Sequence, residues 1–245
     1  MTVRERFSQN FVLAKDDVKS RLLSRSLLWM GLGVAVITLV AFLSLRVESF
    51  HNIITRFAIN NGFWISLIIN MGLIMGIFFV LRNPNISIII PALMYAGFAF
   101  YQGFFVAVTL DWNGITNFTD FLLVMLVPGG IFVLVGLISY LNFFDFTKLA
   151  PFATIALFIL MIMSFILFFI GGTNQRWFLI LAAIVFIVWI GIDIQMIKNT
   201  EEHLSSFNQI QDGKGLNRLA FIFGLRLFID FLNLLLIMIR LIGNR

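Results

Sequence analysis

The sequence predicts an all-α membrane protein with seven transmembrane helices, the seventh of which lies at the centre of the bundle. Hydrophobic residues make up 60% of the 245 residues and charged residues only 12%, whereas a soluble domain averages about 25% charged residues. The apolar residues fall into seven runs, each near or above the ~20 residues that a helix needs to cross the hydrocarbon core. The last run also carries a polar stripe, which favours a position inside the bundle.

The seven runs are separated by short polar breaks rich in Asn, Gly and Pro, such as Arg82-Asn83-Pro84-Asn85. Residues 1–26 precede the first run and form an N-terminal segment, and residues 27–245 form one transmembrane domain. The runs are Leu27–Leu45, Phe63–Leu81, Ile86–Leu110, Phe121–Leu141, Pro151–Ile170, Trp177–Ile197 and Leu219–Leu241.

The distribution of Lys and Arg predicts a cytoplasmic N-terminus in a protein of the cell (plasma) membrane. Of the 17 basic residues, Arg226 lies inside the seventh run. With the N-terminus inside, eleven others lie on the cytoplasmic side and five outside, as the positive-inside rule requires. The N-terminal segment is long and mixed in charge, and no small-residue cleavage site follows the first run, so we expect a retained helix. The outer five are Arg46, Arg56, Arg176, Arg240 and Arg245.

The net charge of +5 does not indicate a nucleic-acid partner. Six basic residues precede the first run with acidic residues between them, which is typical of a topology signal with affinity for the anionic headgroups of a lipid bilayer. The chain has no Cys, which excludes disulfides and thiolate metal sites. Its two histidines, His51 and His203, fall in predicted loops, so we expect no multi-histidine centre and no cofactor.

Two carboxylates interrupt otherwise apolar runs: Asp193 in the sixth and Asp230 in the seventh. A carboxylate at membrane depth costs roughly 2.5–3.5 kcal/mol even on the most permissive insertion scale. Each must therefore be paired with a positive charge, kept protonated or placed in a wet cavity. These two positions are the strongest functional candidates in the sequence.

Arg226, Asp230 and Asn233 share one face of the seventh helix, because residues three and four apart are neighbours on a helix. One interpretation is that Arg226 neutralises Asp230 as a structural ion pair. The other is that Asp193 and Asp230 approach and share a proton, since two adjacent carboxylates cannot both ionise easily. For the carboxylates to meet, we expect the sixth helix to continue past Lys198 into the cytoplasm, to about Leu204.

Other residues in the runs predict packing rather than chemistry. Asn70 and Gln102 are expected to make hydrogen bonds between helices, and Arg82 to anchor its helix at the interface. Gly72 and Gly76 form a GxxxG pattern that allows close helix approach. The tripeptide Pro128-Gly129-Gly130 predicts a kink or a broken helix in the fourth span.

The last two spans resemble those of the Bax inhibitor-1 family, and the chain as a whole resembles a bacterial member of that family. The seventh span reads Asp230-Phe231-Leu232-Asn233-Leu234 and later Arg240-Leu241-Ile242-Gly243, which is similar to that family's D-x-x-N-L and R-x-x-G. Ile192-Asp193-Ile194-Gln195-Met196-Ile197-Lys198 is similar to its D-x-Q-x-I-K. The first span, from Leu28 to Val34, and Phe98–Gly103 in the third also resemble the family.

The resemblance implies seven helices, with the last surrounded by the other six. It implies that Asp193 and Asp230 form a proton-sharing pair that senses pH. We expect Arg226 and Asn233 to support this pair from the same face of the seventh helix, and calcium to bind transiently at the two aspartates. Arg82 would then latch onto Asp193. Asn70 stands nearest to the place where bacterial relatives often carry an acidic residue. Bacterial relatives act as pH-sensitive calcium leak channels, and eukaryotic relatives lower organelle calcium and suppress cell death.

We therefore expect a pH-sensitive calcium or other cation leak channel whose partners are calcium ions, protons and the bilayer. The alternatives are a proton-coupled transporter that uses the same carboxylates, and a non-conducting scaffold that binds a partner through Asn199–Arg218. An enzyme is not expected. An intramembrane aspartyl protease also uses two membrane aspartates, but it carries Tyr-Asp and Gly-x-Gly-Asp, where this chain has Ile192-Asp193 and Ile229-Asp230.

Overall fold

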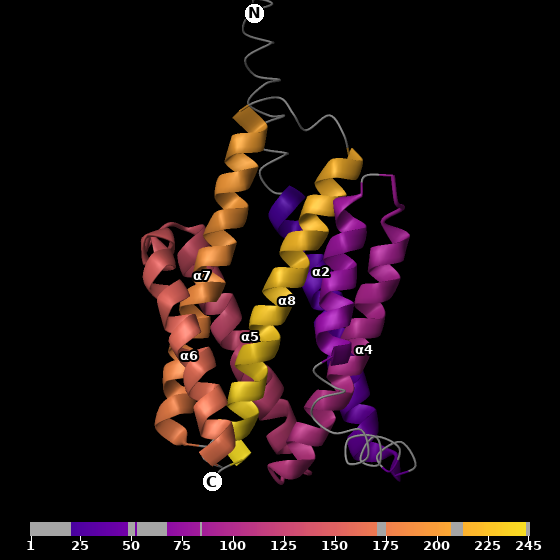
Figure 1. Ribbon diagram of the computed structural model, residues 1–245, viewed down its shortest axis with the longest axis vertical. Helices are drawn as coiled ribbons and strands as arrows, with labels where there is room; N and C mark the ends of the chain where they lie inside the picture. The colour runs from indigo at the N-terminus through magenta and orange to yellow at the C-terminus, as the bar shows by residue number, and fades with distance from the viewer. Residues whose placement is uncertain are drawn as a thin grey trace, which may run out of the picture.

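The computed structural model describes residues 21–48, 52, 68–83, 85–170, 175–206 and 213–243. These residues form a bundle of long helices that run up and down beside one another (Figure 1). The helices are α2 (Arg21–Arg46), an unlabelled helix (Ile68–Arg82), α4 (Ile89–Trp112), α5 (Phe118–Tyr140), the 3-10 helix η1 (Phe146–Leu149), α6 (Ala150–Ile170), α7 (Arg176–Ser206) and α8 (Gly213–Gly243).

Six of the described helices are long and apolar enough to cross a membrane, which confirms a multi-pass all-α membrane protein. They correspond to every predicted span except the second. Ile68–Arg82 covers the described part of the second run, whose first residues, 63–67, lie outside the described residues. Of the predicted N-terminal segment 1–26, the structure describes only 21–26, which form the first turns of α2.

The seventh predicted span, α8, occupies the centre of the bundle, as its polar stripe predicts. Its main neighbours are α2, α7, α5 and α4. Within its most apolar stretch 61% of the residues are buried, against 11% for α6. Since α6 packs mainly on α7 and η1, the arrangement differs from a ring of six helices around a seventh: α6 lies outside α7.

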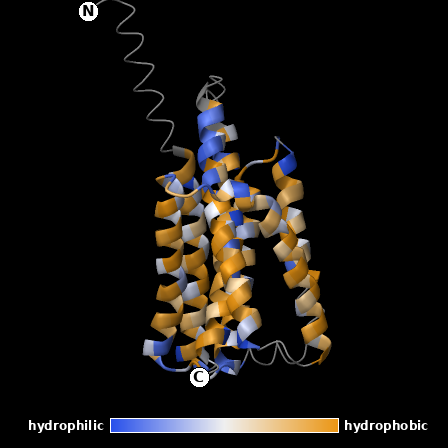
Figure 2. Ribbon diagram, turned by 90° about the vertical axis from the view of Figure 1, so that its left-hand side faces the viewer, coloured by the Kyte–Doolittle hydropathy of each residue, from blue (hydrophilic) through white to orange (hydrophobic). Residues whose placement is uncertain are grey.

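The sixth predicted span extends well past its apolar part. α7 continues to Ser206, which confirms the extension beyond Lys198 to about Leu204. α8 also begins earlier than predicted, at Gly213. Most of the expected connection Asn199–Arg218 is therefore helical, and His203, which we expected in a loop, lies in α7. Figure 2 shows why the apolar run ends before the helix does: the C-terminal turns of α7 are hydrophilic.

The helix α5 runs through Pro128 without interruption, so the predicted break is wrong. Membrane helices tolerate proline where neighbouring helices or local adjustments satisfy the freed carbonyl. The glycine prediction in the second span is confirmed at one position only. A Cβ on Gly76 would lie 2.7 Å from Met94 Cε, whereas one on Gly72 would meet nothing within 4 Å among the described residues.

Candidate functional site

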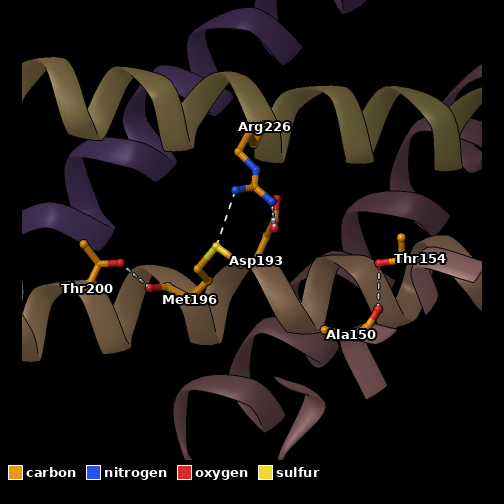
Figure 3. Close-up of polar contacts among 6 residues, drawn as sticks. All are labelled: Ala150, Thr154, Asp193, Met196, Thr200 and Arg226. Carbon is orange, nitrogen blue, oxygen red and sulfur yellow. Dashed lines mark hydrogen bonds and ion pairs between the residues drawn. The ribbon is translucent and has the colours of Figure 1, made fainter. Parts of the chain in front are cut away.

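The candidate site lies between α7 and α8, which pack side by side in opposite directions (Figure 1). Arg226 on α8 donates from Nη2 to Asp193 Oδ1 on α7 at 2.6 Å. Its Nη1 also lies 3.4 Å from Met196 Sδ. Figure 3 shows the guanidinium pointing from α8 toward both side chains. One arginine therefore bridges the two most buried spans of the bundle.

The ion pair is asymmetric in its exposure. The side chain of Asp193 is 3% exposed and that of Arg226 is 34% exposed. A charge-assisted hydrogen bond of this length is stronger than a neutral one. It satisfies a carboxylate that would otherwise be strongly unfavourable at this depth. The pair differs from the structural interpretation offered by the sequence, in which Arg226 neutralises Asp230 on its own helix.

Asp230 completes the cluster from one turn further along α8. Its carboxyl group lies beside that of Asp193, and its Oδ2 atom is inaccessible to solvent and accepts no hydrogen bond from a donor among the described residues. Two carboxyl groups can be joined by a hydrogen bond only if one of them holds a proton. With one shared proton, the cluster of Asp193, Asp230 and Arg226 is electrically neutral.

The opposite face of α7 is fixed to α5 and the segment that follows it. Gln195 donates from Nε2 to Phe144 O at 2.5 Å and accepts the Thr147 N–H at 3.1 Å. Ser139 Oγ donates to Gly191 O at 2.6 Å, and Lys198 Nζ donates to Tyr140 O at 3.0 Å. This face turns about 200° away from Asp193, since successive residues of a helix are separated by about 100°.

Gly191 allows the close contact on this face. A Cβ at this position would lie 2.6 Å from the ring of Phe146, so any larger residue would push η1 away from α7. An isolated glycine inside a helical run is a sequence signal for such a close contact, but the sequence does not show which residue the glycine contacts. Sequence reasoning also missed the contacts of Ser139 and Met196.

The other side of α8 is packed with aromatic residues. Tyr95 donates its hydroxyl to Trp29 O at 2.9 Å, and its ring meets those of Phe221 and Phe228 edge to face. Gly33 lets α2 approach, because a Cβ there would lie 2.6 Å from the Phe228 ring. α8 therefore has a largely aromatic interface with α2 and α4 and a polar interface with α7.

One end of the bundle is held by polar contacts that the sequence did not predict. The buried carboxylate of Glu201 accepts the Leu22 N–H at 3.0 Å and so caps α2. Arg25 Nη1 donates to Asn217 Oδ1 at 2.5 Å. Arg218 Nη1 donates to Asn83 O at 2.7 Å, and its Nη2 donates to Ile86 O. Glu201 thus joins α7 to α2, and Arg25 joins α2 to α8. Arg218 joins α8 to the turn before α4.

The remaining predicted site residues lie away from the cluster or at its edge. Asn70 accepts a hydrogen bond from Gln102 Nε2 at 2.6 Å, which confirms the predicted contact between helices. Arg82 is exposed at the end of Ile68–Arg82, and the ion-pair partner of Asp193 in this structure is Arg226. Asn233 is half-buried on the same face of α8 as Asp230.

Two comparisons with known proteins found sequences similar to this chain. The family described as "Inhibitor of apoptosis-promoting Bax1" matches residues 19–245. A curated protein of Borreliella burgdorferi, described as an "Uncharacterized protein", is 26% identical over 120 residues, which cover 49% of this chain and 50% of that protein. The alignable part thus spans about half the length of that relative. Because the family match covers nearly the whole chain, the protein belongs to the family of inhibitors of apoptosis-promoting Bax1.

Proposed function

We propose that the protein is a pH-sensitive cation leak channel, with calcium as the conducted ion, and that loss of the proton shared by Asp193 and Asp230 opens it. Membership of the family supports a membrane transport or channel-like role. The observation that carries the gating proposal is the pair of neighbouring carboxyl groups, Asp193 and Asp230, held against Arg226 between the two most buried of the described helices.

The charge of the cluster changes with its protonation. With one proton the cluster is neutral, and the carboxyl hydrogen bond holds α7 against α8. Raising the pH removes that proton and leaves two carboxylates against one guanidinium. The two carboxylates, Asp193 and Asp230, then repel each other, which favours separation of the helices. The net negative charge of the cluster also attracts a cation. Conduction therefore increases as the pH rises.

The face of α8 that carries the cluster provides a path for the ion along the helix. From Ile222 to Leu236, the side chains of α8 that are not fully buried recur every three or four residues, and their polar members are Arg226, Asp230 and Asn233. Such a stripe is more favourable beside water or protein than beside lipid. We assign the leak path to this seam between α8 and α7.

Calcium would occupy the seam in transit only. Calcium takes six to eight oxygen ligands, and nowhere in the described ranges do three His, Cys, Asp or Glu side chains come together. Asp193 and Asp230 supply the charge, and carbonyl groups and water complete the shell. Weak coordination suits conduction, because an ion held tightly would not leave.

The proposal places the protein in the plasma membrane with its N-terminus in the cytoplasm, as the distribution of basic residues predicts, and it assigns no enzymatic activity. The polar end made by Glu201, Arg25 and Arg218 would face the cytoplasm. The proton that gates the channel would then report the pH on the cytoplasmic side, since α7 continues beyond Asp193 toward that end.

Calcium flux into liposomes, followed with an enclosed calcium indicator from about pH 5 to pH 9, tests the proposal. Wild-type flux should increase with pH, and Asp193→Asn and Asp230→Asn should each flatten that dependence. Asp120→Asn is the matched control, because Asp120 is exposed in the first turn of α5, and it should titrate like the wild type. Equal pH profiles in all four proteins would contradict the proposal. Flux that requires an opposing proton gradient would indicate a coupled transporter.

A further inference from the structure

We propose that Trp189 is a third member of the gate, a positioning residue whose indole N–H receives the Asp230 carboxylate when the proton shared with Asp193 is lost. This inference deepens the proposed function and rests on it. It starts from two buried polar atoms that have no hydrogen-bond partner among the described residues, Trp189 Nε1 and Asp230 Oδ2. One is a donor and the other is an acceptor.

The two atoms belong to helices in direct contact. Asp193 meets both Arg226 and Asp230, so it stands between the levels of these two residues of α8. Trp189 precedes Asp193 by four residues, about 6 Å along the axis at 1.5 Å per residue, and because the helices are antiparallel this step runs in the direction from Arg226 to Asp230. Trp189 therefore lies within about one turn of the level of Asp230.

Both residues also lie on the faces that meet in the seam. Trp189, Asp193 and Met196 are four and three residues apart, so they share one face of α7. Arg226 contacts Asp193 and Met196 from α8, which shows that this face is turned toward α8. Asp230 follows Arg226 on the corresponding face of α8.

An uncharged donor is what the deprotonated cluster lacks. The charged groups that act on Asp230 are Asp193 from α7 and Arg226 from α8 itself, and Arg226 is already bonded to Asp193. From the other packed helices, Tyr95 donates its hydroxyl to Trp29 O. The charged side chains described on α2, α4 and α5 lie near the helix ends: Arg25, Arg46, Asp111 and Asp120.

The indole N–H stabilises only the ionised form of Asp230, because it can donate but not accept. A donor that favours the charged form makes the proton easier to remove. In the closed state the Asp230 carboxyl bonds to Asp193 and the indole is spare. In the open state the carboxylate moves toward Trp189, so the spare donor biases the equilibrium toward opening.

Trp189→Phe tests the inference, since it removes the N–H and keeps an aromatic ring in the seam. The pH midpoint of calcium flux should move upward by about one unit, the size expected for one hydrogen bond to a charged group. The matched control is Trp112→Phe, at an exposed position at the end of α4, and its midpoint should equal that of the wild type.

An NMR readout separates this inference from the proposed function. The chain has five Trp residues, so the full-length protein in nanodiscs, labelled with ¹⁵N-tryptophan, gives five indole signals, and Trp189→Phe assigns one of them. That signal should move downfield as the pH passes the flux midpoint in the wild type and stay fixed in Asp230→Asn. An unmoved indole signal, or a Trp189→Phe midpoint equal to the wild type, overturns the role of Trp189 and leaves the leak channel intact. An indole signal that titrates in a protein without flux supports the Trp189–Asp230 contact and removes the channel.

Discussion

Arg226 bonds to Asp193 across two helices, at 2.6 Å, rather than to Asp230 four residues along its own helix. The choice leaves Asp230 beside the carboxyl group of Asp193, where the proposed shared proton would act on the contact between α7 and α8. An arginine paired within α8 would neutralise its own helix and would not join it to another. The ion pair therefore contributes to the packing of α7 against α8.

Removing Arg226 should both destabilise the protein and shift its titration. Arg226→Leu leaves Asp193 buried without its positive partner. We expect a loss toward the lower end of the roughly 3–5 kcal/mol known for broken buried pairs, since the arginine side chain is 34% exposed. The flux midpoint should move to higher pH, because a positive charge that favoured the ionised carboxylates is gone. Thermal unfolding in detergent and the flux titration measure the two effects. The double variant Arg226→Leu with Asp193→Leu should recover most of the stability; failure to recover it would contradict the pairing.

Gly191→Ala should loosen the attachment of η1 to α7. The added methyl group would meet the Phe146 ring at 2.6 Å, and overpacking of this kind typically costs about 1–3 kcal/mol. The comparison is Gly129→Ala in α5, where a Cβ meets nothing within 4 Å among the described residues and the melting temperature should be unchanged or higher. Phe146→Leu combined with Gly191→Ala should restore part of the loss. Equal melting temperatures for the two single variants would show that the contact is unimportant.

Arg218→Gln should expose the turn between Ile68–Arg82 and α4. The guanidinium donates to Asn83 O and Ile86 O, and so satisfies carbonyl groups beyond a helix C-terminus, where acceptors lack partners. Amide hydrogen exchange, measured by mass spectrometry on peptides that cover residues 78–90, should become faster. Arg82→Gln, a change of the neighbouring exposed arginine, should leave the exchange of these peptides unaltered. Similar acceleration in both variants would point to a general loss of charge and not to the clamp.

The bond between Asn70 and Gln102 should contribute a measurable coupling energy. The amides lie 2.6 Å apart between two helices, and cycles on such bonds in membranes give about 0.6 kcal/mol, with a maximum near 1.7. Asn70→Leu, Gln102→Leu and the double variant, unfolded by the same denaturant, supply the cycle. A coupling energy indistinguishable from zero would show that the bond adds nothing to stability.

Asp145 should titrate below its ordinary range. The Thr147 hydroxyl, which donates to Asp145 Oδ1 at 2.5 Å, lowers the pKa of Asp145, and Lys148 at 3.3 Å contributes less. A depressed pKa means that the stabilisation is present above the unfolded pKa and is lost as the pH falls through the folded value. Thr147→Val should raise the pKa toward the model-peptide value, followed by NMR titration of the carboxyl carbon, whereas Lys148→Gln should raise it by less. The reverse order would contradict the dominance of the hydroxyl.

The sequence was sufficient for the properties that depend on one helix at a time. Six of the seven spans, the burial of α8 and the extension of α7 to Ser206 could be predicted from apolar runs and from the cost of placing Arg226, Asp230 and Asn233 in lipid. Hydropathy misplaced the beginning of α8, because the polar residues before Leu219 remain helical. Of the kink or break predicted at Pro128, the break does not occur, since the effect of a proline depends on neighbouring helices that the local sequence does not show.

Contacts between helices were harder to predict from the sequence. The meeting of Asp193 with Asp230 could be anticipated, because both are costly in lipid and each gains from the other. Which of them Arg226 would bond depends on the relative rotation and height of α7 and α8, and no local pattern specifies these. The same holds for Ser139 with Gly191 and for Arg218 with Asn83, where a side chain meets a backbone carbonyl that leaves no trace in the sequence.

The two sides of α8 differ, and so the bundle has one part, α2, α4 and α8, that is expected to move as a unit, and a second part, α7, that is expected to move relative to it. The interface with α2 and α4 is aromatic and closely fitted, whereas the interface with α7 carries the proposed shared proton. A cysteine-free chain makes this division accessible to chemical crosslinking, because each introduced thiol pair is unique. A crosslink between α2 and α8 should leave ion flux intact, and one between α7 and α8 should hold the channel shut until a reductant releases it.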